Sequence, residues 1–307
     1  MSRKVGGGKG MKRTVLLLPI LSGILFGSSG VFVRELGAHA LDSATILFLR
    51  TLFAALILAA VLLVRDRRLF RVRWGDLPLF LGTGLLGMLG LNLCYNVALD
   101  RLSLSLAAVL LSTAPVFVML LAALIFRERV TGRKAVCVLL AILGCVLASG
   151  ALEQGGGSLS PAGVAAGLAA AVFYALYSIF SKQATGRGYH TYTVIFYSVL
   201  FITLALLPFA GYGAISAFVA EAPGPGLLFL FVHALCTSVL PYVLLTLALR
   251  HAEAGKVSIL ASGGEPAAAL VFGLLVYSEI PSPWMVLGLV VTVAALALLC
   301  AAPERER

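Results

Sequence analysis

Residues 112–128, STAPVFVMLLAALIFRE, and residues 263–279, GGEPAAALVFGLLVYSE, are two versions of one pattern. In each version a proline is followed thirteen residues later by a glutamate: Pro115 by Glu128, and Pro266 by Glu279. An apolar run separates the two residues, and the register shift between the versions is 151. Shifts of 150 and 147 align other parts of the chain in the same way. The sequence therefore predicts two homologous halves.

Both versions lie within apolar stretches long enough to cross a membrane, since about 20 helical residues span the hydrocarbon of a bilayer. The chain is 61% hydrophobic with a mean hydropathy of +1.05, whereas the apolar share of soluble proteins is about one half. These values predict an all-α integral membrane protein with ten transmembrane helices. The expected spans are roughly 14–33, 44–64, 77–98, 103–126, 133–150, 161–182, 191–211, 226–249, 257–277 and 283–302.

The basic residues are distributed very unevenly between the loops. Of the 23 Lys and Arg residues, 20 lie in the two tails and the even-numbered loops, and only Arg34 and Arg101 lie in the odd-numbered loops. Because basic loops remain in the cytoplasm, we expect both termini there and a multi-pass protein of the bacterial inner or plasma membrane. The net charge of +10 then indicates contact with anionic lipid headgroups rather than with nucleic acid.

Each half contains five expected spans, and this odd number fixes their relative orientation. If the first half begins in the cytoplasm, the second begins outside, so the halves are inverted. Inverted repeats with a binding site between them at mid-membrane recur among secondary transporters. The expected organisation is a cytoplasmic tail (1–13), a first five-helix repeat (14–150), a second, inverted repeat (151–302) and a second cytoplasmic tail (303–307).

The two quoted stretches, the short basic loop after the fourth span and the five-plus-five organisation resemble the EamA-like permeases of the drug/metabolite transporter superfamily. The resemblance covers about residues 14–302, with Ala114 where the second half carries Glu265. It implies a ten-helix fold whose central cavity is lined mainly by helices 1–4 and 6–9, with helices 5 and 10 at the periphery. Members of this superfamily export amino acids, drugs, purines or other metabolites, so the resemblance does not define the substrate.

Glu265 is the ionisable residue placed deepest within an expected span, where charge is costly and usually faces a cavity or a partner. Two interpretations remain open. Glu265 either binds a substrate ammonium or carries a coupling proton, because burial disfavours a charged carboxylate; or it is a permanent partner of Arg50 or a brace for a helix bend. Ser262 shares its helix face. Gly263, Gly264, Pro266 and, in the first half, Pro115 are predicted bending or gating positions, because proline removes a backbone hydrogen bond.

Arg50 and His233 are the other ionisable residues well inside expected spans. Arg50 is interpreted either as a structural cation or as the binding group for a substrate carboxylate. His233 is interpreted either as a packing residue or as part of the substrate site.

Two further spans carry polar faces. Tyr174, Tyr177 and Ser178 share one face of the sixth span, which suits stacking on a cationic or planar ligand, or hydrogen bonding between helices. Asn92 and Asn96 lie one turn apart in the third span and are candidates for contact with substrate or backbone. Tyr95, between them, is interpreted as an anchor at the outer interface.

Other classes of function fit the sequence less well. Intramembrane transfer enzymes need clustered acidic residues to hold a metal, and no such pair or phosphate-binding GxxxxGK[ST] loop occurs. We therefore predict neither metal nor cofactor. The predicted function is a secondary transporter that exports a small amphipathic metabolite such as an amino acid or analogue. A channel-like facilitative permease and a multidrug exporter remain the alternatives, and proton coupling remains open.

Overall fold

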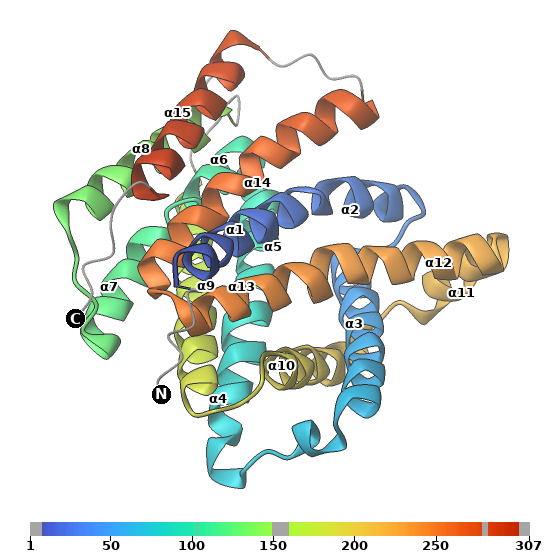
Figure 1. Ribbon diagram of the computed structural model, residues 1–307. Coiled ribbons are helices and arrows are strands. Elements are labelled where there is room, and N and C mark those ends of the chain that lie inside the picture. The colour runs from blue at the N-terminus through green and yellow to red at the C-terminus, as the bar shows by residue number, and fades with distance from the viewer. Residues whose placement is uncertain (1–7, 103, 149–159, 278–281, 301–307) are drawn as a thin grey trace.

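The computed structural model describes residues 8–102, 104–148, 160–277 and 282–300, and every regular element in these ranges is a helix (Figure 1). The first half contains α1 (Gly8–Gly27), α2 (Ser29–Ala38), α3 (Ser43–Arg65), α4 (Leu77–Leu81), α5 (Gly90–Arg101), α6 (Leu104–Leu111), α7 (Ala114–Phe126) and α8 (Gly132–Ala148). The second contains α9 (Pro161–Gly186), α10 (Thr191–Leu206), α11 (Tyr212–Glu221), α12 (Pro223–Ala234), α13 (Leu240–His251), α14 (Ala254–Tyr277) and α15 (Pro283–Cys300). Short 3₁₀ turns lie at Arg67–Phe70, Trp74–Asp76 and Leu207–Phe209.

Seven helical segments in the described ranges are long and apolar enough to cross a membrane. They are Val15–Ala38, Ser43–Arg65, Trp74–Arg101, Val109–Phe126, Pro161–Gly186, Thr191–Phe209 and Pro223–His251. The regions expected for the fifth, ninth and tenth spans are also helical: α8 has 17 residues, α14 has 24 and α15 has 18. The prediction of an all-helical integral membrane protein is thus confirmed, whereas the ten transmembrane helices stay a prediction, since seven such segments are found in the described residues.

Capping residues explain several helix boundaries. Asp42 precedes α3, and its carboxylate accepts the N–H of Ala44 at 3.2 Å. Ser160 precedes α9 and accepts the N–H of Gly163 at 3.3 Å, with Pro161 at the first helical position, where a missing N–H costs nothing. These caps fix where both helices begin, within one residue of the predicted starts.

The third and eighth spans each contain a π-helical segment. The first, η3, covers Gly82–Leu89, and the second, η5, covers Leu235–Val239. Their last residues, Leu89 and Val239, are 150 positions apart, which is the register shift that relates these spans in the sequence. Such wider turns are rare and are often found at functional sites.

The two spans that carry the Pro–Glu pattern differ in the structure. The fourth span is interrupted at residues 112–113, directly before Pro115, so that α6 and α7 are separate helices. The ninth span is a single helix, α14, that continues through residue 266. The helix is therefore interrupted next to the repeated proline only in the first half. Bending or gating at Gly263, Gly264 and Pro266 of α14 stays a prediction. Glu279 lies outside the described residues.

Helices of the two halves pack against each other in reciprocal pairs (Figure 1). The first span, α1, contacts α14 and α13 of the ninth and eighth spans, while the sixth, α9, contacts α7 and α5 of the fourth and third. The second span pairs with the seventh through α3 and α10, and the fifth with the tenth through α8 and α15. The last pair lies at one edge of the molecule, which is the peripheral position that the family resemblance implies for helices 5 and 10.

Glycine permits the closest of these approaches. A Cβ atom at Gly23 would lie 2.1 Å from the carbonyl oxygen of Ala261, and one at Gly264 would lie 2.6 Å from that of Ile20. Next to them, the Ser22 hydroxyl donates to the Pro241 carbonyl at 2.8 Å. Because no side chain fits there, α1 and α14 are in backbone contact, as small residues allow in membrane helices.

We expect Gly23→Ala to destabilise the protein by about 1–3 kcal/mol, because the new methyl group must displace the backbone of α14. The measurement is the thermal unfolding midpoint of the purified protein in detergent. Gly30→Ala is the matched control, since a Cβ there meets no atom within 4 Å. Equal midpoints for the two variants would contradict the tight α1–α14 packing.

Candidate functional site

Six helices bring polar side chains together in the interior of the molecule. They supply Arg50 from α3, Asn92 from α5, Tyr174 and Tyr177 from α9, His233 from α12, Tyr242 from α13 and Glu265 from α14. Most of these residues were predicted singly from the cost of polar groups in hydrocarbon. The structure shows which of them are neighbours.

Arg50 lies in the first third of α3, and its guanidinium donates from Nη2 to Asn92 Oδ1 at 3.1 Å. Asn92 is held in turn because its Nδ2 donates to the carbonyl of Met88 at 2.7 Å. The Arg50 Nε atom is buried and has no hydrogen-bond partner among the described residues. No carboxylate in the described part of the chain pairs with this guanidinium. Arg50 is therefore a half-buried cation with a buried Nε donor left over.

His233 is fully buried and within electrostatic range of Arg50. Its ring stacks on Phe32, with 5.3 Å between centroids and 21° between planes. Neither ring nitrogen has a hydrogen-bond partner within the described residues. The ring of His233 thus packs on Phe32, and its two nitrogens are buried donors or acceptors without a partner in the described residues.

Tyrosine side chains form one wall of this interior region. The hydroxyls of Tyr177 and Thr246 are hydrogen-bonded at 2.7 Å, and Tyr177 meets Tyr242 edge-on with 5.0 Å between ring centroids. Tyr242 also packs edge-on against Phe26 at 4.9 Å. Tyr174, one turn from Tyr177, is close enough to interact electrostatically with both of these phenols.

Glu265 is the twelfth of the 24 residues of α14, and its side chain is exposed. Nevertheless the phenols of Tyr95, Tyr174 and Tyr242, which come from three other helices, all lie within its electrostatic range. Glu265 thus keeps accessible surface although phenols from three other helices lie within its electrostatic range. Among the described residues no ion pair joins Glu265 to Arg50, so the structure does not support the alternative in which the two are permanent partners, and the role of Glu265 stays a prediction.

Tyr242 interacts electrostatically with both Arg50 and Glu265. One aromatic group therefore lies within electrostatic range of a cation and of an anion that form no ion pair with each other in the described residues. Such an arrangement can hold a molecule that carries a carboxylate and an ammonium group, with its apolar part against the rings.

The other predicted site residues have less distinctive surroundings. Ser178 donates to the Tyr174 carbonyl of its own helix at 3.2 Å. Asn96 and Ser262 are half-buried and make no side-chain hydrogen bond in the described ranges. A Cβ at Gly263 would lie 2.6 Å from Leu296 of α15, so Gly263, like Gly264, has a packing reason to be glycine. Roles of these residues in binding or gating stay predictions.

Tyr242 and Thr246 were not among the site residues predicted from the sequence, and Tyr95 was predicted to lie at the outer membrane interface rather than near Glu265. Tyr95 was expected at the outer interface, whereas the structure has it half-buried and near Glu265. The sequence did contain a signal for Tyr242, because a proline followed by a tyrosine hydroxyl group lies in the middle of an apolar span.

A second set of contacts joins the halves at the end of the molecule that carries the loops 65–76, 127–134, 186–191 and 250–254, called here the basic pole. Glu128 pairs with Lys182 at 2.7 Å and accepts the N–H of Ala254, the first residue of α14, at 2.9 Å. Lys182 also donates to the Ala252 carbonyl at 2.8 Å. Beside this group, Lys134 pairs with Glu253. These contacts, called the latch, give the repeated Glu of the first half a structural role.

The structure is a helical bundle with apolar spans. Among the described residues its interior holds charged groups without an ion-pair partner, and its loops at the basic pole are joined by hydrogen bonds. These features are typical of a multi-pass membrane protein of the transporter class. The sequence model of the EamA-like transporter family matches residues 13–150 and again residues 161–301. The chain belongs to this family, and the resemblance stated from its motifs is confirmed.

Three comparisons place the chain within its class. It is 30% identical over 290 residues to the pseudopaline exporter CntI of Pseudomonas aeruginosa, covering 92% of this chain and 95% of the relative. It is 26% identical over 295 residues to the uncharacterized transporter YxxF of Bacillus subtilis, covering 94% and 89%. A solved crystal structure superimposes with a TM-score of 0.74 at 18% identity, covering 93% of this chain and 96% of the other, which shows the shared fold.

Proposed function

We propose that this protein is a secondary transporter that exports a small amphipathic metabolite, such as an amino acid or an analogue, by alternating access. The observation that carries the proposal is the pair of charges, Arg50 and Glu265, which form no ion pair with each other in the described residues and both interact electrostatically with Tyr242. Arg50 would bind a carboxylate and Glu265 an ammonium group. The exporter named among the relatives supports the direction of transport.

Alternating access needs two halves that can exchange conformations, and three observations support an inverted repeat with cytoplasmic termini. The family model matches the chain twice, the helices of the halves pack in reciprocal pairs, and matching spans carry π-helical segments. Two inverted halves have inward-open and outward-open arrangements of similar energy. The concentration of Arg and Lys at the basic pole supports its placement in the cytoplasm.

The direct test is flux into and out of proteoliposomes. A panel of labelled amino acids, purines, polyamines, sugars and quaternary-ammonium drugs should give saturable flux for amino acids or their analogues, which unlabelled substrate competes. Flux that does not saturate would indicate a channel-like permease instead. Saturable flux of drugs alone would support the multidrug alternative and overturn the assignment of a zwitterionic substrate.

For Glu265→Gln we expect transport that no longer depends on a proton gradient, in a protein that still folds. A carboxyl group that gains and loses a proton in each cycle couples transport to protons, whereas glutamine cannot titrate. The measurement is the initial rate with and without an imposed gradient. Glu35→Gln is the control, because Glu35 is exposed at the end of α2, away from the basic pole. Flux of the Glu265→Gln protein that still responds to the gradient as the parent does would remove this residue from the coupling mechanism.

A further inference from the structure

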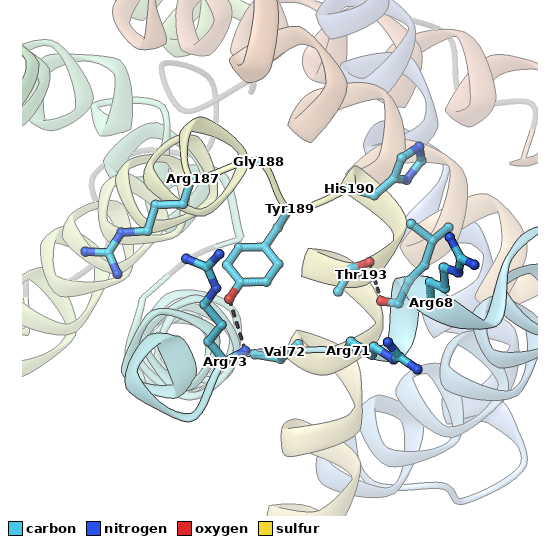
Figure 2. A pocket seen from close by; sticks show the side chains of 10 residues that line it. Arg68, Arg71, Val72, Arg73, Arg187, Gly188, Tyr189, His190 and Thr193 are labelled. Carbon is cyan, nitrogen blue, oxygen red and sulfur yellow. Dashed lines mark hydrogen bonds between the residues drawn. The ribbon is translucent and has the colours of Figure 1, made fainter.

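The basic pole contains a cavity between the two halves that the transport mechanism does not use (Figure 2). Its volume is about 350 Å³. One wall comes from the segment that links α3 to α4, and the other from the turn between α9 and α10. The lining residues are Arg68, Leu69, Arg71, Val72, Arg73, Arg187, Gly188, Tyr189, His190 and Thr193.

The cavity is strongly positive, since its lining includes four arginines and no Asp or Glu. Asp76, just outside, pairs with Arg187 and accepts the Tyr189 hydroxyl at 2.6 Å. Asp66 accepts the backbone N–H of Arg68 at 2.8 Å. The guanidinium groups of Arg68, Arg71 and Arg73 form no ion pair within the described residues. Like charges held together in this way favour the binding of an anion.

The walls of the cavity are tied to each other rather than loosely apposed. Tyr189 Oη accepts the backbone N–H of Arg73 at 3.2 Å, and the Thr193 hydroxyl donates to the carbonyl of Leu69 at 2.8 Å, as Figure 2 shows. Tyr197 donates to the Phe70 carbonyl at 2.7 Å. His190 caps α10, so the positive end of this 16-residue helix adds to the field of the arginines. The cavity is thus pre-formed.

The position of the cavity indicates the source of the anion. Val64 and Trp74, which flank the arginine segment in the chain, are 89% and 90% exposed. An exposed Trp next to Arg at the end of a membrane span is typical of the level of the lipid headgroups. Anionic lipids supply phosphate at this level, and guanidinium groups bind phosphate through paired hydrogen bonds.

We propose that this cavity binds the phosphate group of an anionic phospholipid, which contacts Arg71 and Arg73 of the first half and the α9–α10 turn of the second. The proposal rests on the proposed cytoplasmic placement of the basic pole but on no assumption about the substrate. A bound headgroup adds a bridge between the halves and relieves the repulsion between the arginines. Soluble phosphate compounds offer the same chemistry, and the experiment distinguishes the two sources.

The experiment measures the thermal midpoint of the delipidated protein in neutral detergent while one compound is added at a time. The compounds are phosphatidylglycerol, phosphatidylcholine, glycerol phosphate and inorganic phosphate. The test variant carries Arg71→Gln and Arg73→Gln. The control carries Arg67→Gln and Arg133→Gln, which remove the same charge from exposed positions outside the cavity lining. Native mass spectrometry counts the lipids that each variant retains.

Phosphatidylglycerol should raise the midpoint of the parent and control proteins, with an apparent affinity at least tenfold weaker for the test variant, which should also retain one lipid fewer. Equal stabilisation by inorganic phosphate or glycerol phosphate would overturn the lipid source. Equal weakening in the control would overturn the site, because it would show diffuse attraction between charges. Flux of the parent in phosphatidylcholine liposomes is measured separately, so failure of the proposed transport function is distinguishable from failure of the lipid site.

Discussion

Replacing Arg50 by glutamine should weaken substrate binding about tenfold or more while the folded protein stays as stable as the parent or becomes more stable. A hydrogen bond to a charged group contributes about 1.5–3 kcal/mol, which corresponds to roughly 10- to 150-fold in affinity. Stability should not fall, because Arg50 is a half-buried cation whose buried Nε lacks a partner and which no carboxylate of the described residues neutralises. Removing an unpaired charge from a low-dielectric interior removes a desolvation cost.

The two measurements are ligand affinity and the thermal midpoint, taken on the same preparations. Arg101→Gln is the matched control, since it makes the same change at an exposed position at the end of α5. A structural cation would behave in the opposite way: Arg50→Gln would lower the midpoint and leave the affinity unchanged. That result would remove Arg50 from the substrate site.

Much of the candidate site could be predicted because hydrocarbon tolerates few polar groups. Arg50, Asn92 and Glu265 each stood out for this reason, and the structure places all three among other helices. Which of them are neighbours depends on the rotation and register of α3, α5 and α14, and sequence periodicity does not determine either. For this reason the sequence left open whether Glu265 pairs with Arg50, and no ion pair joins them in the described residues. Tyr242 was missed because tyrosine in a membrane span is usually an interface residue.

For the fold as well, features set by the local sequence could be predicted, whereas features set by packing between helices could not. Hydropathy located the helical regions of the spans but not α11, which lies between two expected spans, and capping residues such as Asp42 fixed some helix ends. The π-helical segment η3 was not predictable, because its cause lies in other helices. A Cβ at Gly84 would lie 2.6 Å from the Ser198 carbonyl oxygen, and one at Gly87 would lie 2.8 Å from Tyr177 Cα. The backbone approaches α10 and α9 this closely only in the assembled bundle.

Replacing Glu128 by alanine should open the latch and speed amide hydrogen exchange at residues 254–255 by about tenfold or more. Glu128 Oε1 accepts the Ala254 N–H at 2.9 Å and pairs with Lys182 at 2.7 Å, with only 10% of the Glu128 side chain exposed. Because this pair is largely shielded from water, it contributes more than a surface pair, and its loss leaves both Lys182 and the start of α14 without an anion. Lys182 also lies over the Phe126 ring at 5.4 Å, so α7, α9 and α14 should loosen together.

If the proposed alternating access and the proposed cytoplasmic placement of the basic pole hold, the latch closes the cytoplasmic side, and the same variant should shift the protein towards the state that opens there. Glu128→Gln should have an intermediate effect, because an amide oxygen still accepts the Ala254 N–H but does not neutralise Lys182. Glu221→Ala removes an exposed glutamate that pairs with His39 at 3.3 Å, in the α2–α3 and α11–α12 connections away from the basic pole, and should leave exchange at 254–255 unchanged. Exchange in Glu128→Ala that matches this control would mean that the latch is only a surface contact. Faster exchange with an unchanged transport rate would separate the latch from the transport cycle.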